Sequence, residues 1–253
     1  MSDQIPTNLR LLRLLEEVAR AGAPVTPTSV NAALGLPKPT LHRLFATAEA
    51  EGFLVRDHDG RRYSPGTRLV RLSIGTLSAE RPQLLRRTVL QDLAAKVGET
   101  CNLAVPDDDG MFYLDRVETH WPLRIQLPAG SRVPFHCTAS GKIYLSSLRS
   151  DYFQRFLKNH VLERQTAQTL TDATVFAAEI AATRARGYAL DNEEFMDGMT
   201  AIAVPIRNAD GRFLFSLSIH APEQRRSIED LVTQLEVLKE AAKRLGEMVS
   251  PVL

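Results

Sequence analysis

Apolar side chains recur every three or four positions through the first 50 residues, and this spacing is typical of helices with one buried face. The pattern predicts three helices, over residues 7–22, 26–35 and about 38–51. Gly22 and Gly35 directly follow the first two apolar stripes, where glycine commonly ends a helix in a left-handed cap. The third helix is predicted to bury Leu41, Leu44, Phe45 and Ala48.

The spacing changes from helical to strand-like after the third predicted helix. Residues 53–63 contain β-forming side chains on both sides of Asp57-His-Asp-Gly60, and an Asp-Gly pair at such a place is a strong hairpin signal. Arg61 and Arg62 lie near the tip, at the start of the return strand. Three helices followed by such a hairpin predict a winged helix-turn-helix.

A winged helix-turn-helix places its third helix in the major groove of duplex DNA and its hairpin beside that groove. The polar residues near the start of this helix are Lys38, Thr40, His42 and Arg43. We expect them to reach base edges, where Arg43 can pair with guanine. We expect Arg61 and Arg62 to contact phosphates or the minor groove. The alternative for the helix is an ordinary solvated face.

Residues 67–77 return to helical spacing and predict a helix that links this module to the rest of the chain. Its apolar positions are Leu69, Leu72 and Ile74. One module offers little to cover them, and reading two DNA half-sites requires two modules, so we expect at least a dimer. The predicted organisation is a DNA-binding domain over residues 1–65, a linker helix over 66–80 and a second domain over 81–253.

The second domain mixes short strands with helices. The expected strands cover residues 102–106, 111–117, 123–127, 201–206 and 213–220. The expected helices cover residues 86–97, 139–148, 151–158, 172–186 and 227–248. Several strands are joined by hairpin turns, so we expect a mainly antiparallel sheet that helices cover on one face, in an α+β fold.

Composition and charge exclude several classes of protein. The net charge is +1, and residues 1–78 carry ten Lys/Arg and seven Asp/Glu, a mild basic bias. No apolar run approaches the roughly 18 residues of a membrane span, and the N-terminus lacks the layout of a signal peptide. Cys101 and Cys137 do not suggest a disulfide scaffold. We expect a soluble, cytoplasmic protein without a membrane partner or a cofactor.

Several separated motifs occur in the order typical of one known family. Glu51-Gly-Phe-Leu54 ends the third helix and Tyr63-Ser-Pro-Gly66 ends the hairpin. Pro134-Phe-His-Cys-Thr-Ala-Ser-Gly-Lys142, Gly187-Tyr-Ala-Leu-Asp-Asn-Glu-Glu194 and Ala201–Gly211 follow. The chain resembles the IclR family of bacterial transcription regulators over almost its whole length. The resemblance implies a winged helix-turn-helix, a linker helix and a GAF/PAS-like effector-binding domain. It also implies dimers, or dimers of dimers, that regulate catabolic operons.

The start of the predicted helix at residue 139 is a natural anion site, because the amides of a first helical turn lack partners. The resemblance assigns polar contacts with a small organic acid to Ala139, Ser140, Asp191, Ser218 and His220. Two positions depart from the family pattern: Ala201 replaces a frequent cysteine, and His220 replaces a serine. We expect apolar walls from Trp121, Leu123, Ile125, Val133 and Met199.

The space at Ala201 and the ring of Trp121 favour an aromatic or otherwise partly apolar acid over a two-carbon acid. Three of these residues also have ordinary structural interpretations. Trp121 could simply be buried, Asp191 could cap a turn, and His220 could be a core histidine bonded to the backbone. In these alternatives the three residues stabilise the fold and do not contact the acid.

Two rival functions are weaker. Catalysis by Cys137 would need a neighbouring base, but adjacent strand residues such as His136 point to the opposite face. We therefore expect no enzyme. A metal-responsive regulator is the alternative, with possible ligands at Cys101, His136, Cys137, Asp191 and His220. These residues lack the close spacing of a metal motif, and no metal site is predicted.

Overall fold

The computed structural model describes residues 5–122 and 127–249. The chain forms two compact units, Met1–Leu77 and Ser78–Leu253. The division between them falls within the stretch predicted to be the linker. None of the described helices is long and apolar enough to cross a membrane.

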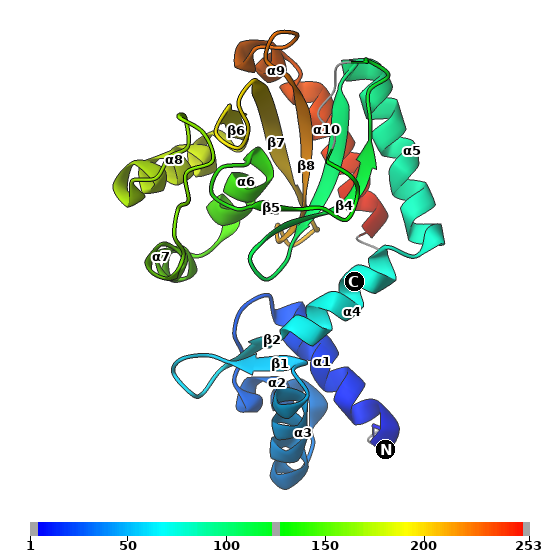
Figure 1. The fold of residues 1–253 in the computed structure, drawn as a ribbon. Coiled ribbons are helices and arrows are strands. Elements are labelled where there is room, and N and C mark those ends of the chain that lie inside the picture. Colours follow the sequence, from blue (N-terminus) through cyan, green and yellow to red (C-terminus); the bar gives the residue numbers. More distant parts are fainter. Residues whose placement is uncertain (1–4, 123–126, 250–253) are drawn as a thin grey trace. The chain divides into compact units, whose positions relative to one another are not determined.

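The N-terminal unit has the predicted order of elements (Figure 1). After a short 3-10 turn, Thr7–Leu9, it contains α1 (Arg10–Ala21), α2 (Pro27–Leu34), α3 (Lys38–Ala50), β1 (Leu54–Arg56), β2 (Tyr63–Pro65) and α4 (Thr67–Leu77). Strands β1 and β2 pair antiparallel to form the wing. The predicted winged helix-turn-helix and the helix that follows it are confirmed.

Local chemistry determines where these helices begin and end. The Thr26 side chain accepts a hydrogen bond from the Ser29 amide and caps α2, and Gly35 ends that helix at a φ of 61°. The Asn31 side chain then bonds both the amide and the carbonyl of Leu36, at 2.9 Å each. These contacts hold the turn before α3.

The core of the N-terminal unit joins the helices to the wing. Phe45 of α3 is almost fully buried, and its ring centroid lies 4.7 Å from that of Tyr63 on β2. Val25 pairs with Tyr63 through the backbone and fastens the wing to the chain before α2. The buried residues of this core are Leu14, Leu15, Val18, Val30, Leu41, Phe45, Ala48, Leu54 and Tyr63.

The C-terminal unit is built on a six-stranded sheet with the order β5-β4-β3-β8-β7-β6, and all its pairings are antiparallel. Its strands are β3 (Thr100–Pro106), β4 (Gly110–Val117), β5 (Arg132–Pro134), β6 (Ala189–Asn192), β7 (Met199–Arg207) and β8 (Phe213–Pro222). Its helices are α5 (Glu80–Val97), α6 (Ala139–Ser147), α7 (Ser150–Asn159), α8 (Ala173–Arg186), α9 (Ile228–Thr233) and α10 (Leu235–Val249). The α+β class and the antiparallel sheet are confirmed.

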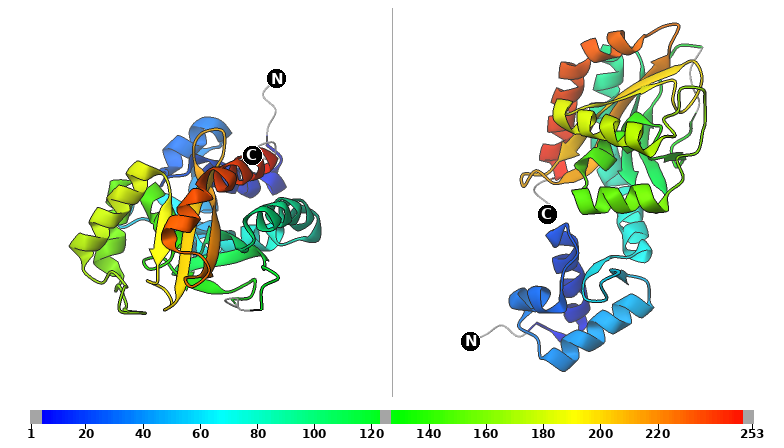
Figure 2. Two further views of the ribbon diagram at one scale, coloured as in Figure 1. Left: turned by 90° about the horizontal axis from the view of Figure 1, so that it is seen from above. Right: turned by 90° about the vertical axis from the view of Figure 1, so that its left-hand side faces the viewer.

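Helices cover both faces of this sheet, so the expectation of one covered face is wrong (Figures 1 and 2). On β7, Ala201 and Ala203 pack in one cluster with Ala139 of α6. The alternate residues of β7, Ile202, Val204 and Ile206, face the other way, where Gly246 of α10 lies against Ile206. Every residue of β3 from Thr100 to Val105 is buried. Both faces of the central strands are therefore interior.

Several element boundaries differ from the sequence prediction. The helix expected over residues 227–248 is interrupted at Gln234, where φ is −87° and ψ is 2°, and forms α9 and α10 instead. Helix α5 begins at Glu80 rather than Arg86. Strands β5 and β6 were not predicted, because they have only three and four residues. The strand expected at 123–127 lies mostly outside the described residues.

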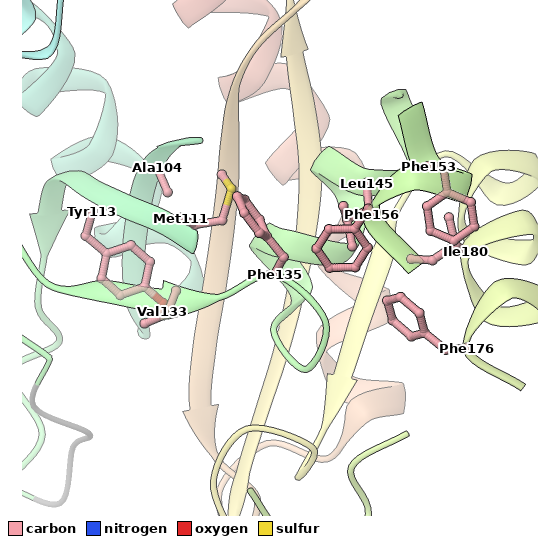
Figure 3. Close-up of a cluster of buried hydrophobic side chains, with 10 residues drawn as sticks. All are labelled: Ala104, Met111, Tyr113, Val133, Phe135, Leu145, Phe153, Phe156, Phe176 and Ile180. Atoms are coloured by element: carbon pink, nitrogen blue, oxygen red, sulfur yellow. The ribbon is translucent and has the colours of Figure 1, made fainter. Parts of the chain in front are cut away.

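An apolar cluster joins α7 and α8 to the sheet (Figure 3). It runs from Tyr113 and Val133, on β4 and β5, through Phe135 to Phe156 of α7 and Phe176 of α8. The rings of Phe135 and Phe156 meet edge to face with centroids 6.0 Å apart. This cluster also supports the segment that leads into α6, where the predicted anion site begins.

Candidate functional site

Helix α3 presents the polar face that the sequence predicted. Lys38, His42 and Arg43 are exposed and Thr40 is half-buried, whereas Leu41 is buried. These polar side chains lie near the N-terminal end of the helix, which is the end that reaches base edges in this kind of module. The structure thus leaves the face of α3 available for DNA.

The two arginines of the wing are in different environments. Arg61 is exposed. Arg62 instead pairs with Asp59 at 2.6 Å and with Asp57 at 3.6 Å. Asp59 also accepts hydrogen bonds from the amides of both arginines, and together with the Arg62 side chain these bonds lower its pKa to about 2. Asp59 therefore stays ionised and offsets the charge of Arg62, a pairing that sequence reasoning missed.

The predicted anion site begins at Thr138, the N-cap of α6. The Thr138 hydroxyl accepts from the Gly141 amide at 3.1 Å and donates to the Pro134 carbonyl at 2.7 Å. A Cβ at Gly141 would lie 2.1 Å from the Phe135 carbonyl oxygen, so only glycine permits this close approach. The Ser140 hydroxyl donates to Ser218 on β8 at 3.2 Å. The first turn of α6 is thus held over the sheet.

Three residues form a row across the sheet beneath this turn. Asp191 on β6 lies opposite Ala201 on β7, which in turn lies opposite His220 on β8. Ala201 packs in the same cluster as Ala139, so the row lies on the face that α6 covers. The small side chain of Ala201 separates two polar residues at the centre of the unit.

Asp191 is completely buried, and its two carboxylate oxygens differ. Oδ1 accepts from the amides of Glu194 and Phe195 at 2.9 and 3.3 Å, so it does cap a turn. Oδ2 is buried with no hydrogen-bond partner. Burial raises the pKa of Asp191 to about 7; the nearby Lys142 opposes this shift and Glu194 adds to it. Lys142 itself is buried and pairs with Glu194.

His220 is also buried and has one ring nitrogen without a partner. Its Nδ1 lies 3.4 Å from Nδ2 of Asn102, and its Nε2 has no partner. Burial lowers the pKa of His220 to about 3, and the charge of Arg116 adds to this effect. The ring is therefore neutral, and it is not bonded to a backbone carbonyl.

Sequence reasoning missed Asn102 and Arg116, which lie beside His220. The Arg116 guanidinium on β4 donates to Oδ1 of Asn102 on β3 at 2.9 Å. Arg116 is 8 % exposed and Asn102 is fully buried. The available signal was the occurrence of these polar residues within strands that are mostly apolar.

The residues predicted to form the apolar walls of the site have different surroundings. Met199 is buried on the same face of β7 as Ala201. Val133 belongs to the cluster of Figure 3. Trp121 is 54 % exposed rather than buried, and Arg225 lies over its ring at 5.5 Å. Leu123 and Ile125 lie outside the described residues.

The possible metal ligands do not converge. Cys101 lies opposite Ile219, on the face of the sheet away from His220. The Nε2 of His136 donates to the Glu163 carbonyl at 2.8 Å. Among the residues that the structure describes, no three His, Cys, Asp or Glu side chains form a metal-binding group. Burial raises the pKa of Cys137 to about 12, which leaves no thiolate for nucleophilic chemistry.

Comparison with known proteins decides the family. The family model of the IclR C-terminal domain of bacterial transcriptional regulators matches residues 83–247, and that of the IclR helix-turn-helix domain matches residues 9–58. The chain belongs to the IclR family. The "Probable transcriptional regulator SauR" of Cupriavidus necator is 37% identical over 94% of each chain.

Solved structures of IclR proteins share the fold. The IclR protein of Thermotoga maritima is 26% identical, with a TM-score of 0.64 over 96% of this chain and 98% of that one. An IclR homologue from Microbacterium hydrocarbonoxydans, complexed with 4-hydroxybenzoate, is 26% identical, with a TM-score of 0.59 over 96% and 98%. The IclR family consists of DNA-binding transcription regulators and not of enzymes, which confirms both of these predictions.

Proposed function

We propose that this IclR-family regulator is controlled by a small organic acid, bound between the first turn of α6 and the row Asp191, Ala201 and His220. One observation carries the proposal: Asp191 Oδ2 and His220 Nε2 are both buried without partners, on either side of Ala201. Each such group costs on the order of 1–3 kcal/mol if it stays unsatisfied. A polar ligand over Ala201 would satisfy both.

The chemistry of the surroundings supports an acid with a second polar group. The free amides of Ala139 and Ser140, at the positive end of α6, suit a carboxylate. Asp191, Ser218 and His220 would orient a hydroxyl group. Met199 and the small side chain of Ala201 favour a partly apolar body, and the 4-hydroxybenzoate complex of a homologue supports an aromatic acid. Trp121, being exposed, adds no support.

Calorimetry with benzoate, 3-hydroxybenzoate, 4-hydroxybenzoate and glyoxylate tests this proposal. We expect a hydroxybenzoate to bind most tightly. Asp191→Asn should weaken the hydroxylated acid and spare, or even tighten, benzoate, because an ionised Asp191 repels a carboxylate. Asp210→Asn makes the same change in the exposed turn between β7 and β8 and serves as the matched control. Equal affinities of wild type and Asp191→Asn for both acids would make Asp191 a structural residue only.

We also propose that Lys38, Thr40, His42 and Arg43 contact the bases of a palindromic operator. The exposure of Lys38, His42 and Arg43 on α3 supports this assignment. In the wing, the exposed Arg61 is favoured over the paired Arg62 for phosphate contact.

A dimer, or a dimer of dimers, completes the proposal. In the linker helix, Leu69 packs on the N-terminal core and Ile74 is half-buried, but Leu72 is 58 % exposed. Leu84 and Leu85 on α5 are 70 % and 57 % exposed. Exposed leucines on successive helices suit burial against a second copy of the chain. Light scattering that gives a 28 kDa monomer at micromolar concentration, with and without DNA, would refute this.

A further inference from the structure

Three polar side chains, one from each of three neighbouring strands, contact one another beside the proposed effector site. Arg116 on β4 lies opposite Asn102 on β3 and donates from Nη1 to Asn102 Oδ1 at 2.9 Å. The Asn102 amide nitrogen lies 3.4 Å from Nδ1 of His220 on β8. Arg116, Asn102 and His220 are 8 %, 0 % and 3 % exposed. These buried groups therefore constrain one another.

The donors and acceptors of these three side chains allow only one arrangement of hydrogen bonds. A guanidinium can only donate hydrogen bonds, so the atom of Asn102 that faces Arg116 must be the oxygen. The amide nitrogen of Asn102 then faces His220 and donates to it. His220 Nδ1 must accept this bond, so it carries no proton. A neutral imidazole has one N–H group, and in His220 that group is at Nε2.

The Nε2–H group of His220 is a buried donor with no acceptor. The two nitrogens of an imidazole point in widely different directions, so Nε2 faces away from Asn102. His220 lies in the row with Ala201 and Asp191, and its Nε2 is buried and unpaired. Asn102 and Arg116 hold the ring in the tautomer that leaves this donor unpaired. An unpaired buried donor costs free energy unless a ligand accepts a hydrogen bond from it.

We propose that Arg116 and Asn102 are positioning residues that hold His220 in the tautomer that offers Nε2–H to an oxygen atom of the effector. This inference rests on the proposed effector site and adds the class of ligand: an acid whose second substituent is a hydrogen-bond acceptor, such as a hydroxy, oxo or carboxylate oxygen. An aromatic amino group at the same point is a poor acceptor for the Nε2–H group, because its nitrogen lone pair is delocalised into the ring. Glu118, which accepts from Nε of Arg116 at 3.2 Å, helps to hold the guanidinium in place.

Nitrogen NMR on the full-length protein tests the tautomer directly. The protein is labelled with 15N-histidine, and long-range 1H–15N correlations are recorded at pH 7. The His220 signals are assigned by their loss in His220→Gln. We expect an unprotonated Nδ1 and a protonated Nε2 in the wild type. A neutral ring with its proton on Nδ1, or a charged ring, would overturn the inference without any variant.

The variant Asn102→Asp tests whether Asn102 sets the tautomer. A carboxylate can only accept, so it should draw a proton to Nδ1 of His220. Cys101→Ala changes the neighbouring residue on the opposite face of β3 and should leave the His220 signals unchanged. If Asn102→Asp keeps the wild-type tautomer in a folded protein, Asn102 does not set it, and the inference fails.

Ligand pairs test the use of the Nε2–H group. Calorimetry compares each of the three hydroxybenzoates with the matching aminobenzoate. We expect the wild type to prefer the best hydroxybenzoate by about tenfold, the value of one hydrogen bond, and Asn102→Asp to lose this preference. Equal affinities in the wild type would overturn the role of His220 as a donor to the ligand. If none of the six acids binds the wild type, the proposed aromatic effector is wrong, and the nitrogen signals alone then decide the inference.

Discussion

Replacing Asp191 by asparagine should remove a large pH dependence from the stability of the C-terminal unit. Asp191 is completely buried, and burial raises the pKa of its carboxyl to about 7. Asparagine keeps a side-chain oxygen for the amides of Glu194 and Phe195, which Oδ1 of Asp191 now accepts. The substitution therefore deletes a titration and preserves the turn.

The sign and size of the effect follow from the two pKa values of Asp191. The ordinary value is 3.8, and the value in the folded chain is about 7. Between them the folded state keeps a proton that the unfolded state has lost, so stability falls as the pH rises. The stabilisation is complete below the pKa of the unfolded state and is lost as the pH rises through 7. From pH 5 to pH 8 the loss is about 3 kcal/mol, because stability falls by about 1.36 kcal/mol per unit up to the folded pKa and then levels off.

Lys142 and Glu194 share this buried network, so about 3 kcal/mol is an upper value for the loss. Urea unfolding of the DNA-free protein at pH 5 and pH 8 measures it. Wild type should lose more stability over this interval than Asp191→Asn. Asp210→Asn, in the exposed turn between β7 and β8, is the control and should follow the wild type. If Asp191→Asn and wild type respond to pH in parallel, Asp191 does not titrate in this range and the reasoning is refuted.

Three further outcomes test the structure. Arg43→Ala should cost about 1–3 kcal/mol on the operator and much less on random DNA, as gel-shift titrations can show; equal losses would make Arg43 a phosphate contact. Arg61→Ala should lower the salt dependence of DNA binding by about one unit of slope, whereas Arg62→Ala should lower it less because Arg62 pairs with Asp59; equal slopes would contradict this. Gly141→Ala should destabilise the protein by about 1–3 kcal/mol in urea unfolding and abolish acid binding, because its Cβ would lie 2.1 Å from the Phe135 oxygen. Gly75→Ala, in α4 with no atom within 4 Å of its Cβ, is the control and should not destabilise the chain.

Local sequence was sufficient for most elements of the N-terminal unit. Thr26, Gly22 and Gly35 mark the ends of helices through bonds and dihedral angles within one turn of chain. The apolar positions of α3, such as Leu41 and Phe45, follow helical spacing and are buried as expected. The hairpin needed only its Asp-Gly turn. Such features depend on residues a few positions apart, so they can be recognised in the sequence.

The resemblance to a family also indicated positions of the proposed effector site that composition could not. Ala139, Ser140, Asp191 and His220 are far apart in the chain, and motifs rather than spacing brought them together. Sequence reasoning missed Asn102 and Arg116 because a polar residue in a short strand carries no mark of its neighbour on another strand. It also placed Trp121 in the site, and the structure leaves that ring half-exposed.

The sequence by itself thus determined the winged helix-turn-helix and the antiparallel α+β domain. Only the tertiary structure decided that both sheet faces are covered, because burial on the second face depends on where α5 and α10 pack. Strand register decided that Asp191, Ala201 and His220 form one row while Cys101 faces away. Register and the alternation of side chains join residues more than 100 positions apart, as in the contact between Asn102 and His220. No local pattern contains that information, because a slip of one residue would reverse every face.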